Sequence, residues 1–326
     1  MLMFTRIKPK VGLALGGGGA RGFAHLGILN ILEKEGFPVD LIVGTSMGAI
    51  VGSLYARLNS AKVATEHFQQ ILNENKSDVH ELNVYQNDGK GDHLFDHIAR
   101  EIKQRITINL SISRQSLFSS ERLQRAVHCL FDDCQIEELP IKFAAAASDL
   151  ISGKGVIINK GSLRNAVIAS SSIPGFFPPV SIKDYLLVDG EVTDLIPVEA
   201  CYALGADMVI AVDVRRTSQT TQKFQHTIDI FMRSAQVTGY RYTDTLLKNA
   251  DFVIRPTLLD VHWSDFDRFR EMVNSGEEAA ANCLSDLQAI FTSRQSGGIL
   301  NKLKKKHKNR DNVSHLEHID LIEFPP

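Results

Sequence analysis

The stretch GLALGGGGARGFAHLG at residues 12–27 decides the fold of this chain. An apolar run at 11–15 meets four consecutive glycines, and from Ala20 onward apolar side chains recur at the spacing of an amphipathic helix. A strand, a tight turn and a helix are therefore predicted. Because glycine carries no Cβ atom, main-chain N–H groups in such a turn can converge at the positive end of the helix.

The next segment repeats this pattern. The run VDLIVG at 39–44 leads into GTSMG at 44–48, and a second helical pattern follows from Ala49. Further strand-like runs lie at 141–150, 153–161, 185–190 and 207–214. Strands that alternate with helices predict an α/β fold with a mostly parallel central sheet flanked by helices.

The composition limits the possible functions. Of the 326 residues, 44% are hydrophobic and the formal net charge is −2, so the chain can bury a large core and has no overall field that would recruit nucleic acid. The four cysteines form no C-x-x-C pair, which is typical of a reducing compartment. The sequence has neither a signal-peptide pattern nor a run of about 18 apolar residues. We expect a cytoplasmic protein with at most peripheral membrane contact.

Three segments are predicted along the chain. Residues 1–295 form one catalytic domain, within which residues 60–135 form a helical insertion. Residues 296–326 form a flexible tail whose basic residues gather at 302–310. The tail is either a solvated extension or a contact for anionic lipid headgroups.

The segment GTSMG has the pattern G-x-S-x-G between a strand and a helix, which is the context of a nucleophile elbow. Ser46 is the predicted nucleophile. Gly44 and Gly48 leave room for the neighbouring strand and helix, with which larger side chains would collide. We expect the backbone of Ser46 to be strained.

The glycine-rich turn contains a G-x-G-x-x-G pattern at Gly17, Gly19 and Gly22. A dinucleotide site needs an acid at the end of the following strand, whereas the nearest acid, Asp40, lies at its beginning. A P-loop is excluded because no Lys-Ser or Lys-Thr follows the glycines. The remaining interpretation is a group of main-chain donors that stabilises an oxyanion.

Residues in and after this turn have predicted roles. The N–H groups of Gly17, Gly18 and Gly19 are expected to form the oxyanion hole. Arg21 either adds positive charge there or holds the loop through a carboxylate or a carbonyl group. His25, one helical turn later, is expected to be a structural histidine.

A serine nucleophile needs a base. Asp189 ends the apolar run YLLVD, and parallel sheets build their sites at the carboxyl ends of strands. Other acids that flank strands are Asp149, Asp207 and Asp213, and such residues are commonly turn or helix caps. The histidines available for a triad are His226, His262, His307, His315 and His318, none of which lies in a glycine-flanked turn after a strand.

Four motifs in the same order resemble those of patatin-like phospholipases: residues 17–22, residues 44–48, SSIPGFFPPV at 171–180 and the pair at 189–190. The resemblance covers residues 11–214. It implies a three-layer patatin-like fold, a Ser46–Asp189 dyad and hydrolysis of lipid acyl esters without a metal or other cofactor. The residues that would support these motifs are Gly22, Gly44, Gly48 and Gly190.

Two residues depart from the family pattern. Glu191 stands where the family has Gly or Ala, and Asp194 stands where it often has Asn. Both would add negative charge near Asp189 and raise its pKa. Apolar side chains of the insertion either line an acyl channel or pack in the core, namely Leu94, Phe95, Leu117 and Phe118.

The sequence thus predicts an enzyme that cleaves phospholipid or lysophospholipid esters through an acyl-enzyme. Two alternatives stay open. One is a serine esterase or thioesterase for small soluble acyl esters. The other is a catalytically weak, lipid-binding regulatory protein, for which Glu191 and Asp194 are the motivating departures. A helical segment HLFDH at 93–97 imitates a zinc motif but lacks a third ligand, so we expect a solvated helix face there.

Overall fold

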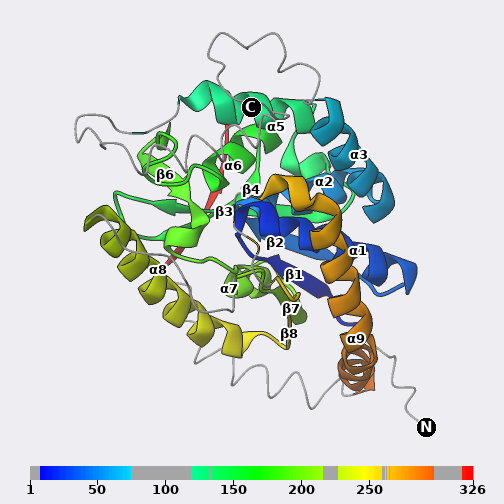
Figure 1. Cartoon of the computed structure of the whole chain (residues 1–326). Coiled ribbons are helices and arrows are strands. Elements are labelled where there is room, and N and C mark those ends of the chain that lie inside the picture. Colours follow the sequence, from blue (N-terminus) through cyan, green and yellow to red (C-terminus); the bar gives the residue numbers. More distant parts are fainter. Residues whose placement is uncertain are drawn as a thin grey trace.

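The computed structural model describes residues 8–74, 116, 119–132, 134–215, 227–258, 261, 263, 265–296 and 318–325. These residues form one nine-stranded sheet with the order β5-β6-β3-β2-β1-β7-β8, in which β4 also pairs with β3, and β9 pairs with β4 (Figure 1). The strands are β1 (Val11–Leu15), β2 (Leu41–Thr45), β3 (Lys142–Asp149), β4 (Gly155–Lys160), β5 (Val180–Ile182), β6 (Tyr185–Asp189), β7 (Met208–Val212), β8 (Phe252–Ile254) and β9 (Ile319–Glu323).

Eight longer helices and several short 3₁₀ turns complete the described part of the chain. The longer ones are α1 (Ala24–Lys34), α2 (Met47–Leu58), α3 (Ala61–Glu74), α5 (Ser120–Leu130), α6 (Leu163–Ser170), α7 (Val198–Ala203), α8 (Thr227–Leu246) and α9 (Phe269–Ser296). The two 3₁₀ turns that concern the site are η1 (Gly19–Phe23) and η4 (Gly190–Val192).

The central strands run parallel, as predicted. Strands β3, β2, β1, β7 and β8 pair in parallel with one another, while β4 and β6 pair antiparallel with β3. Because the carboxyl ends of the parallel strands lie at one edge of the sheet, the turns that follow β1, β2 and β7 come together there. That edge is where the sequence predicts the site.

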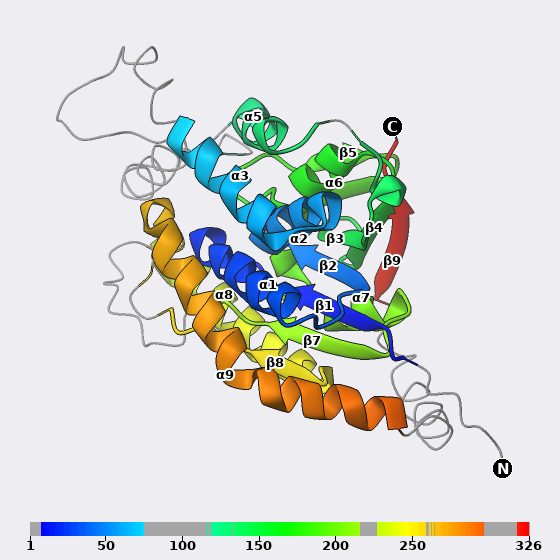
Figure 2. The same cartoon turned by 90° about the vertical axis from the view of Figure 1, so that its right-hand side faces the viewer.

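The sheet is the middle of three layers. Side chains alternate along β1, so that Leu13 and Leu15 pack into a core with α1, α2 and α9, while Ala14 faces a second core with α7 on the opposite side. Figure 2 shows α1, α2 and α9 covering one side of the strands. The α/β class with flanking helices is confirmed.

Helices α1 and α9 cross at very short range. A Cβ atom added to Gly27 of α1 would lie 1.9 Å from the carbonyl oxygen of Val273, and one added to Gly276 of α9 would lie 2.0 Å from that of Ala24. Reciprocal glycines therefore let the two backbones touch. Since α1 follows the glycine-rich turn directly, α9 supports the helix on which that turn rests (Figure 2).

The end of the chain differs from the prediction. Residues 319–323, placed in a flexible tail by the sequence analysis, form β9 and pair in parallel with β4, and Phe324 is buried in the main core. The apolar alternation in IDLIEF was overlooked because it follows a long basic stretch. The basic residues at 302–310 lie outside the described residues, so their contact with lipid stays a prediction.

The segment 60–135 contains helices α3 and α5, in agreement with its expected helical character. The rest of this segment, which includes 93–97 and the apolar residues considered for an acyl channel, lies outside the described residues.

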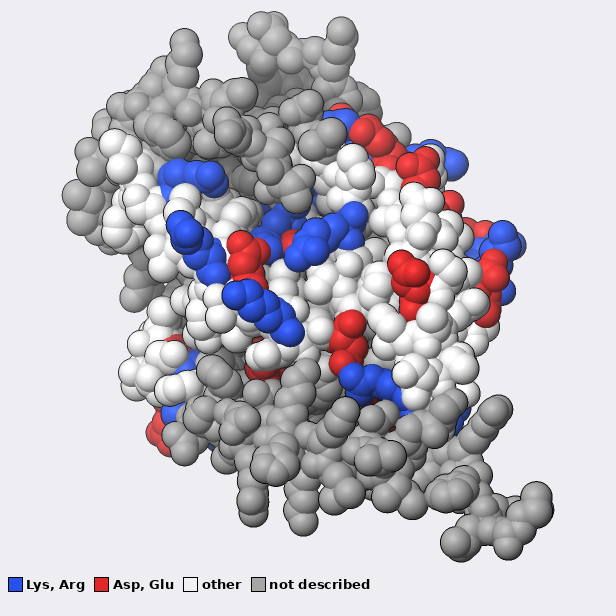
Figure 3. Space-filling model, turned by 90° about the horizontal axis from the view of Figure 1, so that it is seen from below, with Lys and Arg blue, Asp and Glu red and all other residues white. Residues whose placement is uncertain are grey.

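In the described part of the chain, no helix is long and apolar enough to cross a membrane. Figure 3 shows Lys and Arg interspersed with Asp and Glu on one face, so neither sign dominates its described residues.

Candidate active site

Ser46 occupies the sharp turn between β2 and α2. Its φ of 54° and ψ of −121° lie in a region that non-glycine residues rarely adopt, which confirms the predicted strain. The turn is held by Ser170, whose hydroxyl accepts the Ser46 N–H at 3.0 Å and donates to the carbonyl of Ala146 at 2.6 Å. Ser46 is only 7% exposed. Its side chain therefore has a fixed position at the carboxyl edge of the sheet.

Gly44 and Gly48 permit this turn by close packing. A Cβ atom on Gly48 would lie 2.1 Å from the carbonyl oxygen of Leu15, and one on Gly44 would lie 2.3 Å from that of Gly48. Neither collision involves a flexible side chain that could move away. Both glycines are thus required by contacts between main chains, as predicted.

The substitution Gly48→Ala is expected to lower the free energy of unfolding by about 3 kcal/mol, because β1 must shift to admit the methyl group. Gly239→Ala is the matched control, since Gly239 lies inside α8 with nothing within 4 Å of the added Cβ atom. The control should stabilise by about 0.5 to 1 kcal/mol through helix propensity. Urea denaturation measures both, and equal stabilities of the two variants would contradict the packing argument.

Asp189 ends β6 and reaches Ser46 across β3. In the sheet register Thr45 pairs with Ala146 and Asp189 pairs with Ala147, so the two side chains follow neighbouring positions at the same edge. The Asp189 N–H donates to the carbonyl of Ser172 at 2.9 Å, which gives the SSIPGFFPPV motif a role in placing the carboxylate. Asp189 is fully buried.

The two oxygens of the Asp189 carboxyl group differ. Oδ1 accepts the N–H of Glu191 at 2.9 Å, whereas Oδ2 is buried without a partner of good hydrogen-bond geometry. The Ser46 hydroxyl lies near enough to lower the pKa of Asp189 through a hydrogen-bonding interaction. Hydrogen bonds between catalytic groups are commonly long or poorly aligned before substrate binds.

Burial raises the pKa of Asp189 well above its usual value, and the negative charge of Glu191 raises it further. The hydrogen bonds from the Glu191 N–H and from Ser46 act in the opposite direction. Desolvation dominates, as expected for a carboxyl group with no exposed surface. A carboxylate with a raised pKa is a better proton acceptor for a serine hydroxyl than an exposed one.

The two departures from the family pattern have different effects. Glu191 raises the pKa of Asp189, as predicted. Burial raises the pKa of Glu191 itself, and the positive charge of Arg21 acts in the opposite direction. Asp194 is not among the groups that act on Asp189, so that part of the prediction is wrong. Burial and the charge of Glu199 raise the pKa of Asp194 well above its usual value.

Glu191→Gln is expected to move the acidic limb of the pH profile of kcat/KM to lower pH. Asp189 must be ionised to accept a proton, so activity rises with pH through its pKa, and removal of a neighbouring negative charge lowers that pKa. Glu35→Gln is the control, because Glu35 is exposed at the end of α1. An unchanged limb in Glu191→Gln would refute this coupling.

The glycine-rich turn lies against the nucleophile. A Cβ atom on Gly17 would be 3.4 Å from Cβ of Ser46. The peptide between Gly16 and Gly17 is fixed on both sides: its carbonyl accepts from Nε2 of His25 at 2.8 Å and its N–H donates to Leu195 at 3.0 Å. The Gly17 N–H is therefore committed within the fold and is not free for an oxyanion, which differs from the prediction.

Arg21 holds the next part of the turn. Its Nε donates to the carbonyl of Gly18 at 3.1 Å, and the side chain is buried. Since the described chain contains no cis peptide, the N–H of Gly19 points away from Arg21, opposite to the Gly18 carbonyl. Within the described residues, neither the Gly18 N–H nor the Gly19 N–H has an acceptor. Arg21 therefore holds the loop through a carbonyl group, which is one of the two alternatives, and its charge also lowers the pKa of Glu191.

His25 has the structural role expected of it. It is fully buried, and burial lowers its pKa to about 4, so the imidazole is neutral near pH 7. Because a carbonyl oxygen only accepts, Nε2 carries the proton that binds Gly16. Of the histidines considered for a triad, His318 is exposed beside β9, and the other four lie outside the described residues.

Three supporting groups were missed in the sequence. They are the hydroxyl of Ser170, the carbonyl of Leu195 and the hydroxyl of Thr45, which donates to the carbonyl of Asp194 at 2.9 Å. Two of these contacts use main-chain oxygens, which every residue has and no motif can reveal. Ser170 is the one of the three groups that a sequence pattern could have indicated. It belongs to the run ASSSIPG, in which three adjacent serines precede Ile-Pro-Gly, and all three serines are buried.

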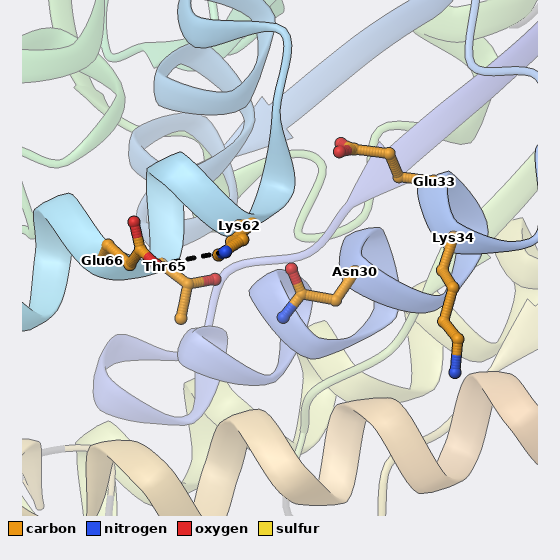
Figure 4. Close-up of a pocket in the computed structure, with 6 residues that line it drawn as sticks. All are labelled: Asn30, Glu33, Lys34, Lys62, Thr65 and Glu66. Carbon is orange, nitrogen blue, oxygen red and sulfur yellow. Dashed lines mark ion pairs between the residues drawn. The ribbon is translucent and has the colours of Figure 1, made fainter.

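Two cavities lie away from this constellation. One, of about 470 Å³, lies between α1 and α3 and is lined by Asn30, Glu33, Lys34, Lys62, Thr65 and Glu66 (Figure 4). Its Glu33 already accepts the N–H of Ala61, and Lys62 pairs with Glu66 at 3.9 Å. The other, of about 330 Å³, lies between β8 and α9. Neither includes Ser46 or Asp189.

Among the described residues, no group of His, Cys, Asp and Glu is arranged to hold a metal ion.

Comparison with known proteins gives the family. The sequence pattern of patatin-like phospholipases matches residues 13–202. An uncharacterised NTE family protein of Mycobacterium tuberculosis is 34% identical over 209 residues, which are 63% of this chain and 49% of that protein. The lysophospholipase nte1 of Aspergillus fumigatus is 31% identical over 211 residues, 65% of this chain and 12% of that protein.

Among solved structures, human GIVD cytosolic phospholipase A2 aligns with 89% of this chain and 60% of its own, at 11% identity and a TM-score of 0.46. The chain spans half or less of the length of the two curated relatives. The family match covers the glycine-rich turn, the elbow and Asp189, which are the elements that meet at the carboxyl edge of the sheet. The chain therefore belongs to the patatin-like phospholipase family.

Proposed function

We propose that this chain hydrolyses carboxylic esters of phospholipids or lysophospholipids with Ser46 as the nucleophile and Asp189 as the base. The observation that carries the proposal is a strained, buried serine beside a buried carboxyl group whose Oδ2 has no other partner. The family and the name of the Aspergillus relative support a lysophospholipid or phospholipid as the substrate class.

In the first half of the reaction, Oγ of Ser46 attacks the ester carbonyl carbon and its proton passes to Oδ2 of Asp189. Negative charge then develops on the carbonyl oxygen. The N–H groups of Gly18 and Gly19 are the available main-chain donors of the turn, so we assign the oxyanion hole to them. The tetrahedral adduct collapses, the ester C–O bond breaks, and the leaving alkoxide takes the proton from Asp189.

The second half reverses these roles. Water gives a proton to Asp189 while its oxygen attacks the acyl-enzyme, and the same two N–H groups stabilise the second oxyanion. Collapse of this adduct releases the fatty acid and returns the proton from Asp189 to Oγ of Ser46. The buried Asp189 is thus the only group that exchanges protons with the reacting atoms.

Arg21→Lys and Arg21→Gln test the origin of the oxyanion hole. Both variants lose the Nε contact that fixes the Gly18 carbonyl, so both should lower kcat by about a hundredfold with little change in KM. Arg21→Lys retains the charge beside Glu191. If Arg21→Lys kept full kcat, the charge rather than the geometry of the turn would be responsible.

The substrate class is tested by offering the purified protein a lysophospholipid, a diacyl phospholipid and a short-chain nitrophenyl ester. We expect release of fatty acid from at least one of the two lipids with kcat/KM well above that for the short ester. Turnover of the short ester alone would favour a small-ester esterase. No turnover of any of the three, together with lipid binding, would favour a regulatory protein.

A further inference from the structure

We propose that the outward face of α8 is a membrane-docking surface that rests on a lipid layer containing anionic headgroups. The proposal extends the proposed function, because it describes how a lipid hydrolase would reach its substrate. It concerns the face formed by Ile230, Phe231, Ser234, Val237, Thr238, Arg241 and Tyr242, which we call the α8 face.

The α8 face is unusually apolar for an exposed surface. Ile230 is 56% exposed, Phe231 68%, Val237 42% and Tyr242 53%, although each is a large hydrophobic side chain. At about 3.6 residues per turn these positions fall within an arc of about 140°. Thr243 lies on the opposite side of the helix and is buried. Figure 1 shows α8 along the outer margin of the molecule.

Two of the three hydroxyl groups on this face are bonded inside the helix. Ser234 donates to the carbonyl of Ile230 at 2.8 Å, and Thr238 donates to that of Ser234 at 3.1 Å. Such bonds to the preceding turn satisfy the hydroxyl proton without water. The third hydroxyl belongs to Tyr242, which is 53% exposed, and tyrosine is a residue type that favours the boundary between acyl chains and headgroups.

The charge of this face favours lipid over a second copy of the chain. Arg233 and Arg241 are the only ionised side chains between residues 230 and 243, and no acid occurs there. The nearby Asp244 is already paired with Arg215 at 2.7 Å. Apolar side chains flanked by arginine suit the boundary between acyl chains and anionic headgroups. The acids Asp229 and Asp244 stand just outside this stretch in the sequence, so within it two copies would bring only arginines together.

The α8 face is tied to the catalytic edge of the sheet. Arg215, which follows β7, donates to the carbonyl of Tyr240 at 2.9 Å and bonds Asp213 at 2.8 Å. Val214, between them, is the residue that a Cβ atom on Gly18 would meet at 2.8 Å. The carboxyl half of α8 is thus anchored behind the glycine-rich turn, and the helix extends about 18 Å from Tyr242 to Ile230.

A second apolar point lies at the same edge. The turn after β3 exposes Leu150 by 50% and Ile151 by 68%, and β3 runs parallel to β2, which ends at the nucleophile. Membrane contact at both points would hold the carboxyl edge of the sheet, and with it Ser46, toward the lipid. Phe231 and Ile151 are the two most exposed large hydrophobic side chains of the described residues.

Sedimentation with sucrose-loaded vesicles tests the proposal in the Ser46→Ala background, so that binding is measured without turnover. The full chain should bind vesicles of phosphatidylcholine with a minor fraction of phosphatidylserine. The double substitution Ile230→Asp and Phe231→Asp should weaken binding at least about tenfold. Val63→Asp is the matched control, since Val63 is a 45% exposed hydrophobic residue on α3, and it should bind like the parent.

Arg241→Gln should weaken binding to the mixed vesicles while leaving binding to pure phosphatidylcholine unchanged, because it removes only the charge. Failure of the parent to bind, or equal binding by the double variant, would overturn the proposal. So would sedimentation equilibrium that shows a dimer in the parent and a monomer in the double variant, because a second copy would then cover the face. Vesicle binding without lipid hydrolysis by the unmutated protein would instead refute the proposed function and leave the docking surface intact.

Discussion

Ser46→Ala should reduce kcat for ester hydrolysis by about four orders of magnitude or more, because no other hydroxyl is presented at the elbow with a base beside it. The same substitution should abolish covalent labelling by a fluorophosphonate, which phosphonylates an activated serine. Intact-protein mass spectrometry measures the labelling, and release of fatty acid from a lysophospholipid measures the turnover.

The control for this variant is Ser60→Ala. Ser60 is a partly exposed serine before α3, whose hydroxyl donates to Glu33 at 3.3 Å and accepts the N–H of Val63 at 3.4 Å, away from Ser46 and Asp189. It should keep both labelling and turnover. If Ser46→Ala were still labelled at one site, another nucleophile would be at work and the assignment of the elbow would be wrong.

Asp189→Asn should lower kcat by about three to four orders of magnitude, since the amide occupies the same space but cannot accept the Ser46 proton. Asp184→Asn is the matched control, because Asp184 is exposed in the turn between β5 and β6 of the same hairpin. Retained turnover in Asp189→Asn would move the base to a histidine. Loss of turnover in both variants would indicate a damaged hairpin rather than a lost base.

The substitution Asp189→Asn should raise the stability of the fold although it lowers kcat. The pKa of Asp189 is raised in the folded state, so its contribution to stability is complete below the pKa of an unfolded Asp and is lost as the pH rises toward the folded value. Near neutral pH, Asp189→Asn should therefore have a higher Tm than the parent. The difference should disappear as the pH falls below about 3, where the carboxyl group is protonated in both states.

Much of the site was predictable because its chemistry lies in short, local patterns. The glycine-rich turn and the elbow each join a strand to a helix, and a Cβ atom on Gly19, Gly44 or Gly48 would collide with main-chain atoms. The patatin-like family, predicted from four motifs in order, is confirmed. The roles of Ser46 and Asp189 in catalysis stay predictions until the substitutions above are made.

The remaining features depend on contacts between distant segments. The commitment of the Gly17 N–H to Leu195 joins residues far apart in the chain through main-chain atoms alone. The raised pKa of Asp194 depends on burial and on the charge of Glu199, which sequence spacing does not reveal. Strand β9 follows a long basic segment that is typical of a flexible tail, so its short apolar pattern did not predict a strand. Apolar residues at helical spacing fit a buried helix as well as an exposed one, so the sequence did not predict that α8 is exposed.

The crossing of Gly27 over Gly276 has a consequence for the order of folding. Helix α1 precedes α9 in the chain, so the side of α1 that α9 covers stays exposed until α9 packs against it. A truncated chain that ends before residue 276 would contain both Ser46 and Asp189 but lack this contact. The proposed hydrolase activity should therefore depend on the docking of a helix that follows both of these residues in the chain.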